Sequence, residues 1–255
     1  MKLATWNINS IRAREERLLT WLGQTKPDVL CLQETKVEDA GFPLAPLKKA
    51  GYEVEIFGQR SYNGVAIAST QPLTDVTRGF GDDQADDEAR VIAATTHGMR
   101  VVCVYVPNGQ DLASDRYPYK LAWFGRLRAY LERTARPDQP LALCGDFNVT
   151  PDDRDVWSPE KWAGQIHVSA PERAALADVA GFGLVDVFRH HNGDEKLYSW
   201  WDYRGVSFFK NQGLRIDMIY LTQPVAARCT ACTIDRNARK GQDASDHAPV
   251  IATIA

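Results

Sequence analysis

The sequence predicts a single α/β domain whose sheets are mixed or antiparallel. Short apolar segments and amphipathic helical segments alternate along 255 residues, a length that suits one large domain. Several apolar segments have no helix after them, which a purely parallel sheet would require. No repeat, low-complexity segment or Gly-, Ser- or Pro-rich linker divides the chain, so we expect one domain over residues 1–255.

The individual elements follow from hydrophobic spacing and from residues that start or stop helices. An apolar strand over 2–9 is followed by a helix over about 11–23, with Ser10 as its N-cap and Gly23 as its end. A short apolar run introduced by Pro140 predicts a buried strand at 141–144. The other expected strands lie at 29–32, 52–57, 65–69, 91–95, 101–106, 228–234 and 249–254, the other helices at 43–49, 116–135 and 171–180, and further apolar segments at 197–201 and 215–221.

Composition indicates a soluble, cytoplasmic protein without a membrane partner. Hydrophobic residues make up 44 % of the chain, enough for a large core, yet there is no apolar run long enough to span a membrane and no signal peptide. The chain has five cysteines, an odd number, and Cys31, Cys103 and Cys144 fall inside apolar strands. This usage favours a reducing compartment.

The net charge of −3 argues against binding nucleic acid by bulk attraction. Much of the acidic excess falls within 82–88, which we expect to form a solvated loop away from any anionic ligand. Any contact with nucleic acid must therefore be local and assisted by a cation. The acids in this segment are Asp82, Asp83, Asp86, Asp87 and Glu88.

Polar side chains stand at the ends or beginnings of several predicted strands. In an antiparallel pair, the beginning of one strand lies beside the end of its neighbour, so all these groups can share one rim of the sheets. Four strands end in such groups and two segments begin with them: Asn7, Glu34, Tyr105 with Asn108, and Asp146 with Asn148 at the ends, and Asp217 and Ser245-Asp246-His247 at the beginnings.

The chemistry that such a rim suits is narrow. Glu34 with Asp146 or Asp246 makes an all-oxygen site that favours Mg²⁺ or Mn²⁺ over zinc. His247 paired with a carboxylate, for which Asp217 is the candidate, would stay protonated and could steady an anionic oxygen. Each residue alone has an ordinary explanation as a solvated strand end or a turn cap, but together they describe attack of water on a phosphodiester.

Six blocks of sequence resemble the exonuclease III family of abasic-site endonucleases, within the endonuclease/exonuclease/phosphatase superfamily. The resemblance runs in order from residue 2 to residue 251, and the QETK and SDHAP blocks are the specific ones, whereas GDxN is shared across the superfamily. The blocks are Trp6-Asn7, residues 32–36 (LQETK), 105–108 (YVPN), 145–148 (GDFN), 213–217 (GLRID) and 245–249 (SDHAP).

The resemblance implies a fold and a role for each site residue. The expected fold is a four-layered α/β sandwich of two packed mixed β-sheets flanked by helices, with the site at one end. Asn7 and Glu34 would hold the metal, with Asp246 nearby. Asn9 stands where some relatives carry an acid that helps to bind metal, so the number of metal ions, one or two, stays open. The remaining implied roles are Asp146 and Asn148 on the attacking water, Asp217 orienting His247, Tyr105 on the scissile phosphate, and Lys36 and Asn108 on the DNA backbone or that phosphate.

Two points stay open at this stage. Either Asp146 or the Tyr105 phenolate could be the general base. The apolar residues near the site have two possible roles. We expect Trp200, Leu214 and Ile216 to form the wall of a pocket for a flipped abasic sugar. Packing in the core is the alternative for all of them and is favoured for Trp201. Further candidates for phosphate contact, each also readable as an ordinary surface charge, are Arg90, Arg116, Lys120, Lys210 and Arg215.

The expected function is that of a monomeric, Mg²⁺-dependent DNA repair nuclease, with Mn²⁺ able to substitute. It would cut double-stranded DNA 5′ to abasic sites and trim matched or blocked 3′ ends, with loops 109–119 and 150–168 setting the balance. One alternative is a hydrolase of another phosphodiester, such as a phosphoinositide or sphingomyelin. The other is a non-catalytic DNA-binding protein on the same fold.

Overall fold

The computed structural model describes residues 1–84, 88–193 and 196–255, and within them the chain forms two six-stranded sheets. The first sheet contains β1 (Lys2–Asn7), β2 (Val29–Gln33), β3 (Glu53–Phe57), β4 (Val65–Ser69), β11 (Cys229–Ile234) and β12 (Val250–Ile254), in the order β11-β12-β1-β2-β4-β3. The second contains β5 (Thr74–Arg78), β6 (Val91–Thr96), β7 (Met99–Tyr105), β8 (Leu141–Asp146), β9 (Leu184–Asp186) and β10 (Asp217–Thr222), in the order β5-β6-β7-β8-β10-β9.

Both sheets are mixed, as predicted. β1 pairs in parallel with β2, and β7 pairs in parallel with β8. β12 and β10 run antiparallel to β1 and β8, which brings their beginnings to the rim where β1 and β8 end. The expectation that strand ends and strand beginnings share one rim is therefore met for these pairs.

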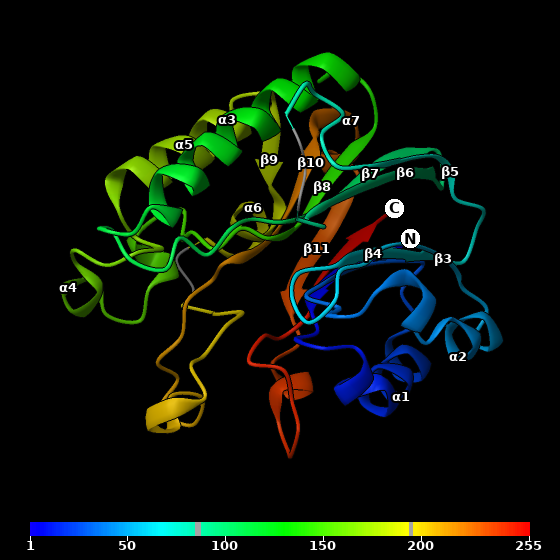
Figure 1. The fold of residues 1–255 in the computed structure, drawn as a ribbon, viewed down its shortest axis with the longest axis horizontal. Helices are drawn as coiled ribbons and strands as arrows, with labels where there is room; N and C mark the ends of the chain where they lie inside the picture. Colours follow the sequence, from blue (N-terminus) through cyan, green and yellow to red (C-terminus); the bar gives the residue numbers. More distant parts are fainter. Residues whose placement is uncertain (85–87, 194–195) are drawn as a thin grey trace.

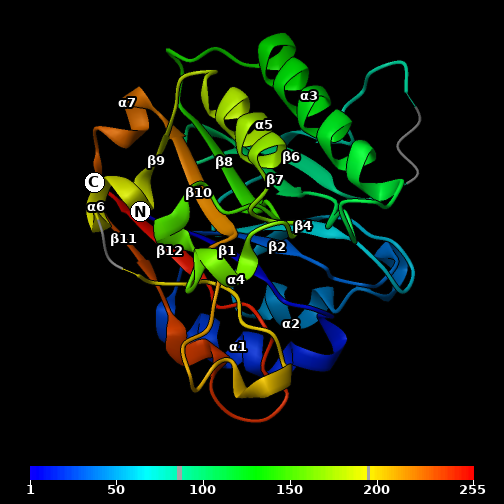
Figure 2. The ribbon, with the colours of Figure 1, turned by 90° about the vertical axis from the view of Figure 1, so that its left-hand side faces the viewer.

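Helices cover the outer faces of the two sheets, so the molecule has four layers (Figures 1 and 2). α1 (Glu15–Thr25) and α2 (Leu44–Lys49) lie on the first sheet, and α3 (Arg116–Thr134) and α5 (Ala170–Ala180) lie on the second. This is the four-layered sandwich that the resemblance implied. The shorter helices are α4 (Pro159–Trp162), α6 (Val187–Asn192) and α7 (Gln223–Ala226).

The strands are buried on both faces because alternate side chains enter different cores. In β7, Val101 and Cys103 pack between the sheets, whereas Val102 and Val104 pack against the helices of the second sheet. Burial on both faces explains why these strands read as continuous apolar runs in the sequence.

The structure differs from the sequence-based elements in a few places. The edge strand β5 was not predicted, because its residues are mostly exposed and carry no apolar run; β9 and α6 were also missed. The first helix starts with a 3₁₀ turn and continues as α1 to Thr25, past Gly23, with Lys26 in the left-handed conformation after it. The apolar segment at 197–201 is a loop with a bridge at Trp200 rather than a strand.

Part of the acidic segment differs from the solvated loop that we expected, although Asp83 is exposed. Asp82 accepts hydrogen bonds from the Arg126 guanidinium, and Glu88 forms ion pairs with Arg90 and Arg116 beside Tyr105. Asp86 and Asp87 lie outside the described residues. All five cysteines are buried free thiols, and no helix within the described ranges is long and apolar enough to cross a membrane.

Candidate active site

Four of the predicted site residues continue the inward-facing positions of their strands. Side chains alternate along a strand, so Asn7 points to the same side as Leu3, and Tyr105 to the same side as Val101 and Cys103. By the same count, Asp146 follows Ala142 and Cys144, and Asp217 precedes Ile219 and Leu221. The apolar layer between the sheets therefore ends in a cluster of polar groups.

His247 lies between two carboxylates of this cluster. Its Nδ1 donates to Asp217 Oδ2 at 2.8 Å, and its Nε2 lies 3.8 Å from Asp146 Oδ2. Burial alone would lower the pKa of His247, but the charges of Asp217 and Asp146 outweigh it and raise the pKa to about 10. The imidazole is thus a buried cation at neutral pH.

Asp146 has the opposite perturbation. Its burial, together with the nearby Asp217 and Glu34 charges, outweighs the effect of His247 and the hydrogen bond from Asn7, and raises the pKa of Asp146 to about 7. A carboxylate with this pKa can accept a proton near neutral pH. Its position is fixed by the backbone N–H of Asn148, which donates to Oδ1 at 2.9 Å.

Glu34 and Asp146 are joined by the side chain of Asn7. The Asn7 Nδ2 donates to Glu34 Oε1 at 2.8 Å and to Asp146 Oδ2 at 2.9 Å, while its oxygen accepts from the Asn9 backbone N–H at 3.0 Å. In this arrangement Asn7 turns its N–H groups, not its oxygen, toward the carboxylates. Its role as a metal ligand stays a prediction.

A group of three side chains can hold a metal ion. Glu34, Asp146 and His247 each offer one ligand atom, and these atoms all lie within 4.8 Å of one another. Because His247 is protonated, the oxygen atoms of the two carboxylates are the ligands that fit, and oxygen donors suit Mg²⁺ or Mn²⁺. Burial acts to raise the pKa of Glu34, but Lys36, whose Nζ lies 2.7 Å from Oε2, and the hydrogen bond from Asn7 lower it.

Asp246 stands apart from that group. Its Oδ1 accepts from Asn9 Nδ2 at 2.9 Å and its Oδ2 accepts from the Trp200 indole at 3.0 Å. Lys36 Nζ donates to the Asn9 side-chain oxygen at 2.6 Å. Asp246 thus lies at the same rim but is tied to Asn9 and Trp200, and its part in metal binding remains a prediction.

The two asparagines of the YVPN and GDFN blocks meet above Asp146. Asn108 is exposed, and its Nδ2 donates to Asn148 Oδ1 at 3.2 Å. Asn148 is buried, and its Nδ2 donates to the Val106 carbonyl at 2.9 Å. Tyr105 lies beside them, with the Arg90 guanidinium 4.7 Å from its ring centroid. Burial, followed by the charges of Glu34 and Asp146, raises the pKa of Tyr105 well above its ordinary value.

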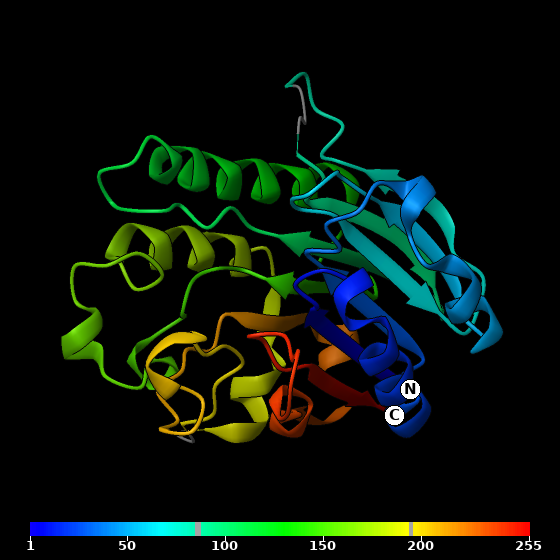
Figure 3. The same ribbon diagram turned by 60° about the horizontal axis from the view of Figure 1, so that its bottom comes forward.

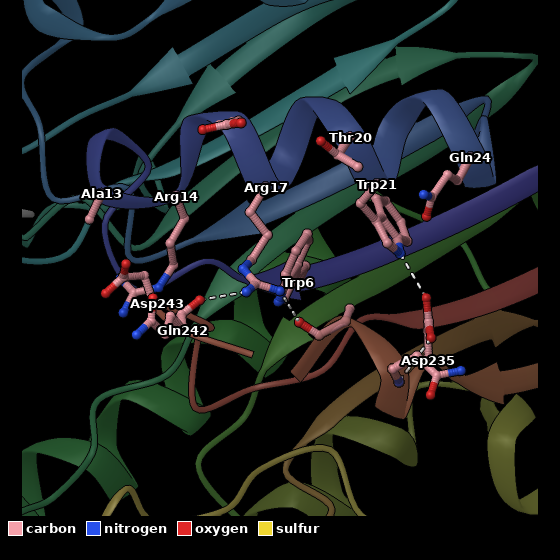
Figure 4. Close-up of a pocket in the computed structure, with 13 residues that line it drawn as sticks. Trp6, Ala13, Arg14, Arg17, Thr20, Trp21, Gln24, Asp235, Gln242 and Asp243 are labelled. Atoms are coloured by element: carbon pink, nitrogen blue, oxygen red, sulfur yellow. Dashed lines mark hydrogen bonds between the residues drawn. The ribbon is translucent and has the colours of Figure 1, made fainter. Parts of the chain in front are cut away.

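Side chains of α1 form hydrogen bonds with the segment that precedes His247. A cavity of about 450 Å³ separates the helix from residues 235–243, and Figure 4 shows side chains of α1 reaching across it. Arg17 donates to the carbonyls of residues 238, 240 and 242, and the Trp21 indole donates to Asp235 Oδ2. The Trp6 indole donates to the His247 carbonyl at 3.2 Å. These contacts fix the backbone from which His247 projects.

The predicted pocket residues divide into a partly buried group and a buried one. Trp200 is partly buried, and its backbone forms bridges to Leu214 and His247. Leu214 and Ile216 are fully buried in a small apolar cluster against Trp200, so they support that residue rather than form an open wall. Trp201 is core, packed edge-on against Phe208, as favoured from the sequence.

Two of the candidate phosphate contacts are wrong. Lys120 and Arg215 have no exposed surface. Arg215 binds Asp155 and Asp186, and Lys120 binds Glu172. Arg90 is largely buried and paired with Glu88, whereas Arg116 and Lys210 are exposed.

His167, which was not predicted as a site residue, lies buried beside Asn148. Its Nδ1 donates to the Asn148 carbonyl at 2.5 Å. Burial, followed by the nearby Lys120 charge, lowers the pKa of His167 to about 4, so its imidazole is neutral at pH 7. His167 lies in the loop at 150–168, well past the end of the predicted strand at 141–144, so the pattern of polar residues at strand ends did not include it.

A buried acid–base pair lies at the rim of a two-sheet sandwich, next to carboxylates that could hold a metal ion, and this arrangement suits a hydrolase. The chain matches the model of the endonuclease/exonuclease/phosphatase family over residues 4–247 and belongs to that family. It is 36 % identical to exodeoxyribonuclease III of Haemophilus influenzae, over 99 % of each chain.

Two solved structures are similar over the whole chain. An AP endonuclease from Archaeoglobus fulgidus superposes with a TM-score of 0.97 at 40 % identity, covering 100 % of this chain and 99 % of that one. A 3′ phosphatase from Neisseria bound to a product DNA hairpin superposes with a TM-score of 0.96 at 39 % identity, with the same coverage.

Proposed function

We propose that the protein is a Mg²⁺-dependent DNA repair nuclease that hydrolyses phosphodiesters 5′ to abasic sites and trims 3′ ends. The observation that carries the proposal is the position of His247, a buried cation between Asp217 and Asp146, next to Glu34. Relatives whose names describe exodeoxyribonuclease, AP endonuclease and 3′ phosphatase activity supply the substrate class.

Asp146 is the proton acceptor for the attacking water in this proposal. Its pKa of about 7 suits that role, whereas Tyr105, whose pKa is raised well above its ordinary value, stays a phenol that can donate to the phosphate. His247 faces the developing negative charge on the phosphate with its Nε2–H, and Asp217 keeps the ring oriented and protonated. Asn148 and Asn108 position the water and the phosphate.

Glu34, with Asp146 and the amide of Asn7 beside it, is where a Mg²⁺ ion would be held. Once bound, the ion would neutralise charge on the phosphate and polarise it toward attack. Mn²⁺, which accepts the same oxygen ligands, should substitute. Asp246 is the candidate carboxylate for a second position.

DNA contact is local, as the net charge requires. A groove of about 510 Å³ is lined by Tyr105, Asn108, Arg90 and Arg116, among other residues. Lys36 lies across the rim from it, and Trp200 offers an aromatic face for a sugar that lacks its base. One chain supplies Glu34, Asp146, Asp217 and His247, which supports action as a monomer. The proposal also takes double-stranded DNA as the substrate and the cytoplasm as the location.

Four labelled substrates test the proposal: a duplex with a tetrahydrofuran abasic analogue, an undamaged duplex with a recessed 3′ end, a duplex with a 3′-phosphate, and a phosphoinositide. Each is incubated with Mg²⁺ or with EDTA, and Asp146→Asn serves as the inactive control. We expect Mg²⁺-dependent cleavage of the DNA substrates by the unsubstituted protein alone, and their relative rates rank the three activities. Cleavage of the lipid alone, or DNA binding without cleavage, would replace the proposal with one of the two alternatives.

A further inference from the structure

Lys120 is a buried cation that bonds to both asparagine loops of the site. It lies on α3 and has no exposed surface. Its Nζ donates to the carbonyl of Asn108 at 3.0 Å, to the carbonyl of Asn148 at 2.7 Å and to Glu172 Oε1 at 2.5 Å. An ammonium has three hydrogens to donate, so every one of them is used.

Glu172 is itself held firmly on α5, the helix that lies alongside α3 (Figure 3). It forms a capping box with Ser169 at the start of that helix and accepts from the backbone N–H of His167 at 3.1 Å. Burial would raise the pKa of Glu172, but Lys120 lowers it. The position of the ammonium is therefore set by two packed helices and not by the loops that it contacts.

The two carbonyls that bond to Lys120 belong to residues whose side chains bond to each other next to Asp146. Asn148 has a φ of +51°, a left-handed conformation that most residues avoid. In this conformation its carbonyl accepts from both Lys120 and His167, while its side chain bonds to Asn108 and to the Val106 carbonyl. A change in the backbone at Asn148 would break the bond to Lys120 and would disturb the bond from the Asn148 N–H to Asp146 Oδ1.

The path of the Lys120 side chain depends on a glycine. Gly109 has a φ of +93°, and a Cβ at that position would lie 3.1 Å from Lys120 Cδ. The loop after Asn108 thus leaves room for the lysine stem. A buried ion pair often contributes little to net stability, so stabilisation alone is a weak reason to bury a lysine here.

We propose that Lys120 is a positioning residue that fixes where the Asn108 and Asn148 side-chain amides lie relative to the scissile phosphate. It acts through two backbone carbonyls and touches neither substrate nor metal. This role rests on the proposed function, because it concerns the same site. Displacement of a positioned group by about 1 Å is enough to cost on the order of 100-fold in rate.

The test compares two variants that both remove the ion pair. Glu172→Gln keeps Lys120 and its two carbonyl bonds, whereas the double variant K120M/E172Q removes these bonds without leaving a buried charge unpaired. We expect kcat to fall by about 10- to 100-fold in the double variant, with KM within about threefold, and to stay within about threefold in Glu172→Gln. Equal kcat in the two variants would overturn the proposal.

Controls separate positioning from loss of stability. Leu131→Ala removes a fully buried side chain from the other end of α3 and should destabilise by about 2–5 kcal/mol while leaving kcat unchanged below its melting transition. If the double variant is unfolded, Gly109→Ala, which crowds Lys120 without changing a charge, should lower kcat in its place, and an unchanged kcat there would overturn the role. Inactivity of the unsubstituted protein would refute the proposed function instead.

Discussion

Asp217 lies directly opposite Asp146 in the antiparallel register of β10 and β8, and His247 lies between the two carboxylates. The pair therefore shares one charged imidazole but has two different environments. Asp217 accepts from Nδ1 in a fully buried position, whereas Asp146 is also bonded to Asn7 and to the Asn148 backbone. This difference supports the proposed division of roles, in which Asp217 orients the imidazole and Asp146 accepts the proton.

Asp146→Asn should lower kcat by at least about 1000-fold while leaving the Kd for duplex DNA within about threefold. The amide has the same shape but cannot accept the proton from water. Turnover and binding are measured on the same abasic duplex, with Asp138→Asn, an exposed residue, as the control. A parallel loss of binding and turnover would assign Asp146 a structural role.

Glu34→Gln should raise the Mg²⁺ concentration needed for half-maximal activity by about 10- to 100-fold. The neutral amide keeps the size of the side chain but removes the negative charge that attracts the cation. Mg²⁺ titrations of the variant are compared with those of Glu53→Gln, an exposed acid on β3. Superimposable titrations would remove Glu34 from the metal site.

Asp217→Asn should lower the pKa of His247, because the Asp217 charge is the main influence that raises it to about 10. The folded-state pKa is raised, so the stabilisation from the charged pair is complete below pH 6.5 and is lost as the pH rises through about 10. In the variant, the alkaline loss of kcat should move down by at least about one pH unit. NMR titration of the His247 ring gives the direct measurement, and an unshifted ring would refute the pairing.

His167 should make the protein less stable in mild acid. Its folded-state pKa is lowered to about 4 from 6.5, so its contribution is fully present above pH 6.5 and is lost as the pH falls toward 4. The free energy of unfolding should drop by up to about 3 kcal/mol across this range. Denaturant titrations of His167→Gln should show a flatter pH dependence, whereas the exposed His190→Gln should behave like the unsubstituted protein.

Much of the site followed from the sequence because strand ends carry a readable signal. An apolar run that stops at Asp146 or Asn7 marks both the end of a strand and a polar rim. The four-layer arrangement came from the resemblance, since alternation within one strand does not say which sheet it joins. The exposed edge strand β5 had no apolar run to reveal it.

Whether a charged residue is exposed or buried in an ion pair could not be predicted from the sequence. Lys120 and Arg215 resemble surface cations, and only the fold brings Lys120 to Glu172, 52 positions away, and Arg215 to Asp155, 60 positions away. Both are buried partners in internal ion pairs rather than contacts for phosphate. Long-range pairing of this kind depends on how helices and loops pack, which local sequence does not encode.

The alternation of side chains along β1, β7, β8 and β10 limits where residues can be inserted or deleted in this chain. One residue inserted or deleted within any of these strands would turn the functional side chain at its site end from the inner to the outer face. Insertions in the connecting loops, in contrast, leave that alternation untouched. We therefore expect changes in loop length to leave the strand-borne site residues in place, whereas a change in the residue count of one of the four strands would remove its residue from the site.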